Sequence, residues 1–259
     1  MTRLPLTLLY VPGDRPDRVR KAVASTADVV IVDLEDAVVG AAKDRARATM
    51  ADLVAELATG PSRRHLQVRV NHPASTWGQA DLEMMRGLPT TVGVRLPKCE
   101  TSESVRAVAD AVGDRALHLL LESALGVERA FVLATCHSRV ASVGLGEADL
   151  RADLGVSGEE GVLWSRGRLV SASVAAGLGP PAMSVFTDVG DLAALTASCH
   201  RGRELGFRGR AAIHPSQLAP IHAAFTPTTD EVARAREVLA AAAAGERSGA
   251  GAVALPDGR

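Results

Sequence analysis

Short apolar runs recur along the chain, separated by segments with helical spacing. Eight such runs are present: LTLLYVP, DVVIVDLED, HLQVRVN, VGVRLPK, LHLLLES, VASVGLG, AMSVF and RAAIHP. Most are continuous rather than alternating, which is typical of parallel strands buried on both faces. The intervening segments, such as PDRVRKAVAS and SESVRAVADAV, place apolar residues three and four positions apart. The pattern predicts repeated units of a strand followed by a helix, and hence a parallel sheet.

The number of units and the chain length favour one closed barrel. The chain has 259 residues, close to the roughly 250 residues of an eight-stranded α/β barrel. An open doubly wound sheet is the alternative, but the first strand is followed by VPGDRP rather than by a glycine-rich GxGxxG turn. We therefore predict a (β/α)8 TIM barrel as the catalytic domain over residues 1–225, an extra C-terminal helix over 226–246 and a short flexible tail over 247–259.

Composition and charge narrow the classes of partner. Lys plus Arg number 29 against 30 Asp plus Glu, so no global field favours nucleic acid or an anionic membrane. No apolar run approaches the 18 or so residues of a membrane span, and a soluble cytoplasmic protein is expected. Cys99, Cys136 and Cys199 are widely spaced without a CxxC, which favours free thiols. GxSxG, P-loop and HExxH motifs are absent from the sequence. The expected partner is a small molecule.

Two carboxylates stand out at predicted strand ends, where a barrel enzyme gathers its active site. Glu122 follows an almost uninterrupted apolar run and precedes small residues, and Asp149 lies one strand and helix further on. Such a pair, without nearby His or Cys ligands, suits Mg²⁺, which takes oxygen ligands and commonly one or two carboxylates. A capping or salt-bridged Glu122 is the structural alternative.

Arg69 alternates with Val68 and Val70, so its guanidinium points to the side of the strand opposite to theirs. Inside a barrel mouth this planar group of donors suits a substrate carboxylate. An ion pair with Glu35 or Asp36 on the neighbouring strand is the alternative. His214, which precedes a proline, is interpreted as a structural histidine.

Several ordered motifs resemble one known family. LLYVPGDRPDRVRKA, ADVVIVDLEDAV, VRVN, RLPKCETSESV, LLLESALGV, GLGEADLRADLG and GFRGRAAIHPSQL are similar to the citrate lyase beta-subunit-like branch of the HpcH/HpaI aldolase family, in order from Leu8 to about Leu239. The resemblance implies a TIM barrel that assembles as a homotrimer or hexamer and requires Mg²⁺. It also implies cleavage or formation of a 3-hydroxyacyl thioester such as citryl-, malyl- or citramalyl-CoA, giving an acyl thioester and a 2-oxo acid.

The resemblance also implies roles for individual residues. Glu122 and Asp149 match the family's metal ligands, and Arg69 matches its catalytic, substrate-carboxylate arginine. Backbone N–H groups from Gly146 through Glu147 and Ala148 to Asp149 would help to hold the 2-oxo acid, so Glu147 needs only its main chain there. In addition to its role as a metal ligand, Glu122 is expected to take part in substrate binding.

One departure from the family pattern concerns the end of the sequence. Family members continue past a DGR-like stretch into a lid with an acidic residue that reaches a neighbouring subunit, whereas this sequence stops at Arg259. A thioester lyase remains the first expectation. An aldolase acting on free 4-hydroxy-2-oxo acids and a non-catalytic paralogue that binds 2-oxo acids are the alternatives.

Overall fold

The computed structural model describes residues 5–59 and 65–248. The chain divides into two compact units, one ending at Phe225 and the other beginning at Thr226. The first unit holds the sheet and all the predicted site residues, so the two units are described separately.

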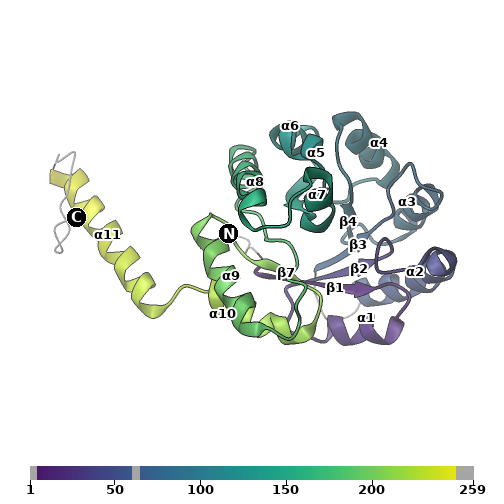
Figure 1. Cartoon of the computed structure of the whole chain (residues 1–259), viewed down its shortest axis with the longest axis horizontal. Coiled ribbons are helices and arrows are strands. Elements are labelled where there is room, and N and C mark those ends of the chain that lie inside the picture. The colour runs from purple at the N-terminus through teal and green to yellow at the C-terminus, as the bar shows by residue number, and fades with distance from the viewer. Residues whose placement is uncertain (1–4, 60–64, 249–259) are drawn as a thin grey trace. The chain divides into compact units, whose positions relative to one another are not determined.

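The first unit is built on one curved parallel sheet (Figure 1). Its strands are β1 (Thr7–Pro12), β2 (Val29–Asp33), β3 (His65–Arg69), β4 (Gly93–Leu96), β5 (Leu117–Leu121), β6 (Val140–Leu145) and β7 (Arg210–Ala212). Their order across the sheet is β6-β5-β4-β3-β2-β1-β7, and every neighbouring pair is parallel. The prediction of a parallel α/β sheet is confirmed, with seven of the eight apolar runs forming its strands.

The remaining run, AMSVF at residues 182–186, forms no strand, and closure into an eight-stranded barrel is not confirmed. Met183 makes one isolated parallel bridge to Arg210, through its N–H to the Gly209 carbonyl (2.9 Å) and its carbonyl from the Ala211 N–H (3.0 Å). Pro180 and Pro181 precede it and lack the N–H groups that a strand ladder needs. In the described part of the chain, the link to β6 is instead the side chain of Ser184, which donates to the Leu145 carbonyl.

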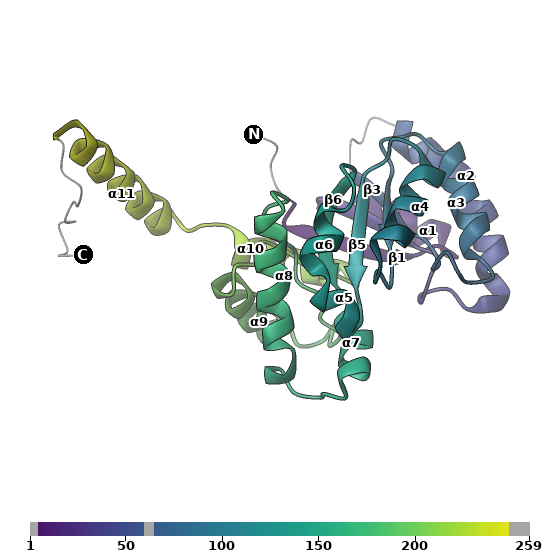
Figure 2. The ribbon, with the colours of Figure 1, turned by 90° about the horizontal axis from the view of Figure 1, so that it is seen from above.

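Helices surround the sheet on its outer side, as the two views show (Figures 1 and 2). The α-helices of this unit are α1 (Pro16–Val23), α2 (Lys43–Thr59), α3 (Gly78–Gly87), α4 (Ser102–Val112), α5 (Ala124–Glu128), α6 (Ala130–Thr135), α7 (Glu147–Leu154), α8 (Leu163–Ala175), α9 (Leu192–Glu204) and α10 (Leu218–Phe225). Short 3₁₀ turns are η1 (Gly40–Ala42), η2 (Glu160–Val162) and η3 (Pro215–Gln217).

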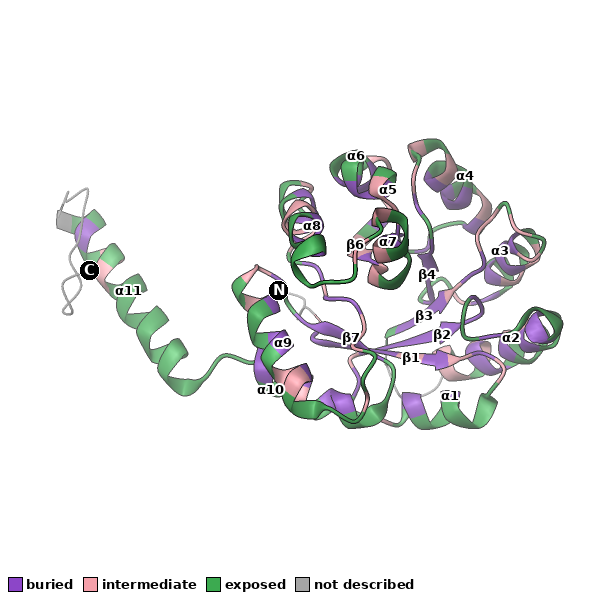
Figure 3. Cartoon of the chain, in the orientation of Figure 1, coloured by how far each residue is buried: buried purple, intermediate pink, exposed green. Residues whose placement is uncertain are grey.

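Helix α4 shows why these segments become helices. It buries Val105, Val108, Ala109 and Val112, at the spacing of one helical face. The Thr101 side chain accepts from the Ser104 N–H at its start, and Gly113 takes a positive φ of 73° at its end. Such helices cover the outer face of the sheet, and the main apolar cluster is formed by buried residues of both. Figure 3 shows buried residues along the strands and on the helices.

The inner face of the sheet is different. A small apolar cluster of Leu8, Val29, Ile31 and Ala211 covers part of it. The rest lines a cavity of about 1020 Å³ and carries polar side chains. A barrel interior is usually filled with branched apolar residues, so the open polar part indicates a binding site.

The second unit contains one helix, α11 (Thr229–Ser248). Thr228 and Glu231 cap its start reciprocally, with the Glu231 N–H donating to Thr228 Oγ1 (3.2 Å) and the Thr228 N–H to Glu231 Oε2 (2.8 Å). Most of its side chains are exposed. Among the described helices of both units, none is both long and apolar enough to cross a membrane. Most of the tail predicted at 247–259 lies outside the described residues.

Candidate functional site

The carboxyl ends of neighbouring strands bring the predicted site residues to one edge of the cavity. Arg69 is the last residue of β3, Glu122 directly follows β5, and Gly146 separates β6 from α7. The cavity is lined by all six residues singled out from the sequence: Arg69, Glu122, Gly146, Glu147, Ala148 and Asp149. Adjacent parallel strands end at the same edge, which is why residues 80 positions apart in sequence meet here.

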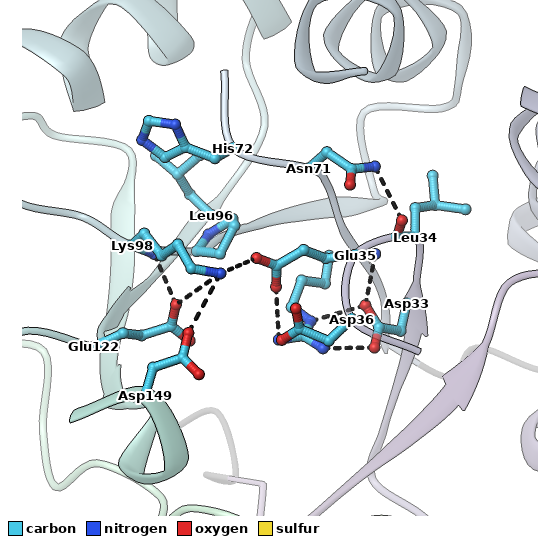
Figure 4. A network of polar contacts seen from close by, with 12 residues as sticks. Asp33, Leu34, Glu35, Asp36, Asn71, His72, Leu96, Lys98, Glu122 and Asp149 are labelled. Atoms are coloured by element: carbon cyan, nitrogen blue, oxygen red, sulfur yellow. Dashed lines mark hydrogen bonds and ion pairs between the residues drawn. The ribbon is translucent and has the colours of Figure 1, made fainter. Parts of the chain in front are cut away.

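Lys98 lies among the carboxylates, although the sequence alone gave it no role. Its ammonium lies 2.5 Å from Glu35 Oε1, 3.3 Å from Asp149 Oδ2 and 4.0 Å from Glu122 Oε2, and its main-chain N–H donates to Glu122 Oε2 at 3.0 Å. Figure 4 shows the side chain extending between Glu122 and Asp149 on one side and Glu35 on the other. Among the described residues, Lys98 is the one non-glycine residue with a positive φ, 53°. This strained backbone turns both its N–H and its ammonium toward Glu122.

Arg69 makes the ion pairs that the structural alternative predicted. Its Nε and Nη2 donate to the two Asp33 oxygens (2.8 and 2.6 Å), and Nη1 donates to Asp36 (3.1 Å) and lies 2.8 Å from Glu35 Oε2. These three hydrogen bonds use three of the five guanidinium donors. Arg69 is therefore fixed in place. Because Nη1 is also paired with Glu35, the second N–H of Nη2 is the donor that remains for another acceptor.

A second polar network supports the loop that carries Glu35. The Lys43 ammonium donates to the Leu34 and Glu35 carbonyls (2.9 and 2.6 Å) and to Asn71 Oδ1 (2.6 Å). Asp81 accepts from both the main chain and the side chain of Asn71 (2.8 and 2.7 Å). All of these groups are buried, so they hold the loop after β2 rigidly beside β3. Sequence reasoning missed this network because Lys43 and Asp81 lie in helices, where charged residues are usually solvated.

Negative charge exceeds positive charge at the cavity edge. Five carboxylates, those of Asp33, Glu35, Asp36, Glu122 and Asp149, share ion pairs with the two cations Arg69 and Lys98.

The pKa values reflect this imbalance. Burial raises the pKa of Glu122 to about 7, and the negative charge of Glu35 raises it further than Lys98 lowers it. Burial also raises the pKa of Glu35 above its usual range, against the effects of Arg69 and Lys98. A buried carboxylate whose pKa is raised in this way is stabilised as an anion by an added cation.

The start of α7 offers main-chain donors rather than the Glu147 carboxylate. Both oxygens of Glu147 accept from Arg166 (2.8 and 2.6 Å), so its carboxylate is already paired. The Glu147 N–H already donates to Ser184 Oγ at 3.3 Å. The N–H groups of Ala148 and Asp149 lie in the first helical turn, where no carbonyl of the same helix accepts from them.

The donor set fits a hard divalent cation. Glu122 and Asp149 present carboxylate oxygens to the cavity, and their shared contact with the Lys98 ammonium shows that one cation can lie near both. Within residues 5–59 and 65–248 no group of three or more His, Cys, Asp or Glu side chains is arranged to hold a metal ion. Mg²⁺ does not require one, because it commonly binds one or two carboxylates and completes its octahedron with water and substrate oxygens.

These features define an α/β enzyme with a carboxylate-lined site at the carboxyl ends of its strands. Residues 6–215 match the HpcH/HpaI aldolase/citrate lyase family. The chain belongs to this family, as the sequence motifs indicated, and its class of enzyme is that of carbon–carbon lyases.

Named relatives cover nearly the whole chain. A (3S)-malyl-CoA thioesterase of Cereibacter sphaeroides is 33% identical over 98% of this chain and 88% of that protein. The citrate lyase subunit beta of Escherichia coli K12 is 33% identical over 98% of this chain and 87% of its own length.

A solved structure of CitE from Mycobacterium tuberculosis, in complex with magnesium, acetoacetate and coenzyme A, matches with a TM-score of 0.78 and 31% identity, over 93% of this chain and 88% of that one. The same protein with oxaloacetate and magnesium matches with a TM-score of 0.73 and 31% identity, over 86% and 97% of the two chains. The curved parallel fold is therefore that of CitE.

Proposed function

We propose that this protein is a Mg²⁺-dependent lyase that cleaves or forms a 3-hydroxyacyl-CoA thioester, such as citryl-, malyl- or citramalyl-CoA. The products of cleavage are an acyl-CoA and a 2-oxo acid. The observation that carries this proposal is the buried carboxylate of Glu122, beside Asp149, at a cavity edge where five carboxylates meet two cations. The CitE complexes with magnesium support the choice of metal.

In this proposal, Glu122 and Asp149 hold the metal. Bound Mg²⁺ would polarise the oxygen on the carbon that becomes the 2-oxo group and stabilise negative charge there. The Lys98 N–H and the absence of a side chain at Gly146 fix the orientation of Glu122. Lys98 also ties Glu35, and through it Arg69, to the same arrangement.

The substrate carboxylate is assigned to two sets of donors. Arg69 keeps one N–H, on Nη2, beyond its contacts with Asp33, Glu35 and Asp36. Ala148 and Asp149 line the same cavity, and their N–H groups lie at the positive end of α7. Gly146 and Glu147 contribute through the main chain at this turn.

The bond that breaks joins C2 and C3 of the 3-hydroxyacyl chain. The electron pair of that bond goes to C2, which takes a proton to complete the acyl-CoA, while the C3 hydroxyl loses its proton and becomes the ketone of the 2-oxo acid. Preorganised donors around the cleaved bond lower the barrier because they need no reorganisation during reaction.

Three further assignments follow from family membership. We propose that residues 182–186 take the place of one barrel strand, that residues 226–246 form an extra C-terminal helix that is not part of the barrel domain 1–225, and that the protein assembles as a homotrimer or hexamer. We also propose a cytoplasmic location, which the free, buried thiols of Cys99 and Cys199 support.

The test is an assay of purified protein with malyl-, citramalyl- and citryl-CoA, with Mg²⁺ or with EDTA, following acyl-CoA and 2-oxo acid by mass spectrometry. We expect Mg²⁺-dependent formation of both products, lost by at least about 100-fold in Glu122→Ala and Asp149→Ala. Asp153→Ala is the matched control, since Asp153 lies on α7 but accepts from the Ala124 N–H instead (2.7 Å).

The other outcomes distinguish the rival functions. Release of free CoA with an intact hydroxy acid would identify a thioesterase, which the malyl-CoA thioesterase relatives favour. Turnover restricted to free 4-hydroxy-2-oxo acids would identify an aldolase. Binding of 2-oxo acids without turnover of any thioester would identify a non-catalytic paralogue.

A further inference from the structure

Arg95 is a buried arginine on the inner face of the sheet that the proposed reaction does not yet use. It lies on β4 in direct register with Arg69 on β3, is 6% exposed and lines the cavity. Arg69 is paired with three carboxylates. Arg95 donates through Nε to the neutral Gln67 Oε1 at 3.0 Å, and no carboxylate of the described residues lies within ion-pair distance of it.

The guanidinium of Arg95 lies one layer of side chains below Glu122. It approaches the Tyr10 ring, with Cζ 6.0 Å from the ring centroid, and a Cβ at Gly144 would lie 4.0 Å from its Nη1. Gly144 precedes by two residues Gly146, which packs against Glu122. Two residues of a strand span about 6.6 Å. The level of Gly144, beside Arg95, and the level of Gly146, beside Glu122, are therefore about 6.6 Å apart along the chain.

The side chains that surround Arg95 leave its charge uncompensated. Its register neighbour on β5 is His118, whose Nδ1 is hydrogen-bonded to Ser142 Oγ at 2.8 Å. Burial, together with the charge of Arg95, lowers the pKa of His118 to about 3, so this ring is neutral. Burial likewise raises the pKa of Tyr10, whose hydroxyl stays neutral. A buried guanidinium without an anion is costly, and the cavity leaves room for one beside it.

We propose that Arg95 binds a second carboxylate of the substrate, so that the 2-oxo acid preferred by this enzyme is a dicarboxylate such as oxaloacetate. The inference rests on the proposed function, which places the 2-oxo group at Glu122 and Asp149. An extended carboxymethyl substituent on that group reaches about 3.8 Å through two carbon–carbon bonds and one carbon–oxygen bond, and a charge-assisted hydrogen bond of about 2.8 Å completes the roughly 6.6 Å to the level of Gly144. A pyruvate or glyoxylate unit would leave Arg95 buried and unpaired.

The experiment compares three 2-oxo acids in the presence of Mg²⁺ by calorimetric titration: oxaloacetate, pyruvate and 4-methyl-2-oxopentanoate, an apolar acid of the same shape as oxaloacetate. For the wild-type protein we expect oxaloacetate to bind at least about 30-fold more tightly than either monocarboxylate. In Arg95→Met this preference is expected to disappear, with pyruvate affinity changed by less than about threefold. Arg95→Lys keeps the charge but loses the bidentate geometry, and we expect it to restore part of the preference.

Pyruvate binding by each variant reports that the protein is folded and that the metal site is intact. Equal affinities for oxaloacetate and 4-methyl-2-oxopentanoate in the wild type would overturn the inference, even if Arg95→Met does not fold, while leaving the proposed function in place. An unchanged preference in a folded Arg95→Met would overturn it as well. If no 2-oxo acid binds with Mg²⁺, the proposed function fails, and the inference fails with it.

Discussion

The position of the Glu122 carboxylate depends on the absence of a side chain at Gly146. A Cβ built at Gly146 would overlap the Glu122 carboxylate, at distances that real atoms do not adopt. The φ of Gly146 is −96°, so an alanine there would not be strained by its backbone. Substitution therefore acts through the clash and displaces the carboxylate.

We predict that Gly146→Ala weakens Mg²⁺ binding at least about tenfold, because displacement of one ligand by even 1 Å disrupts octahedral coordination. Titration calorimetry with Mg²⁺ measures this. Gly167→Ala is the matched control, since no atom lies within 4 Å of a Cβ at that helical position. Unchanged metal affinity in Gly146→Ala would remove Glu122 from the ligand set.

His118 makes stability depend on pH in the acid range. Its folded pKa of about 3 lies below the unfolded value of about 6.5. Between these values the unfolded chain binds a proton that the folded chain does not, so stability is lost as the pH falls from about 6.5 to about 3. We expect urea unfolding at several pH values to show a shallower dependence of the free energy of unfolding on pH in His118→Asn, by at most about 1.4 kcal/mol per pH unit. The same dependence of the free energy of unfolding on pH in both proteins would show that the His118 ring is protonated as readily in the folded chain as in the unfolded chain.

At the scale of single residues, the sequence predicted the face of the sheet on which a residue lies better than it predicted that residue's ion-pair partners. Alternation along VRVN and VGVRLPK is enough to place Arg69 and Arg95 on one face of the sheet. It does not show that Asp33, Glu35 and Asp36 pair with Arg69, because those contacts depend on how the loop after β2 folds back. Nor does it show that Arg95 faces neutral groups. The position of Lys98 at a strand end was visible in the sequence, but its role was not, since that role depends on a positive φ that no local pattern indicated.

At the scale of elements, Ser184 joins the segment 182–186 to the end of β6. Its hydroxyl donates to the Leu145 carbonyl and accepts from the Glu147 N–H. We predict that Ser184→Ala costs about 1 kcal/mol of stability and speeds hydrogen exchange of the Glu147 amide, which loses its acceptor. Hydrogen exchange followed by mass spectrometry checks this, with the exposed Ser171→Ala on α8 as control. Unchanged protection at Glu147 would mean that another group holds this turn.

The same segment shows why the strand prediction was incomplete. The run AMSVF has the apolar character of the other seven runs. The two prolines before it and the single bridge from Met183 to Arg210 leave it outside the sheet. A strand needs a neighbouring strand on each side, paired in a defined register. An apolar run by itself specifies neither the neighbours nor the register. The seven strands were predictable because each is followed by a helix of the correct spacing that covers its outer face.

At the scale of the whole molecule, the unit that contains the sheet and the unit that contains α11 are separate. The buried apolar clusters of the described residues end at Phe225, so the core does not include α11. Val232 and Leu239, which are 38% and 70% exposed, lie seven positions apart on one face of α11. An exposed apolar face of this kind suits self-association, which we proposed from the family.

We therefore predict that a chain ending at Phe225 folds with a Tm within about 4 °C of the full chain but does not self-associate. Light scattering after gel filtration measures the mass, and calorimetry measures Tm. Leu239→Lys in the full chain should reduce self-association in the same way, because it places a charge where apolar contact is needed. Glu237→Lys, also a charge change but away from the Val232 and Leu239 face, is the control and should leave the mass unchanged. A shortened chain that keeps the mass of an oligomer would place the subunit interface on the first unit instead, and the exposed face of α11 would then have no part in assembly.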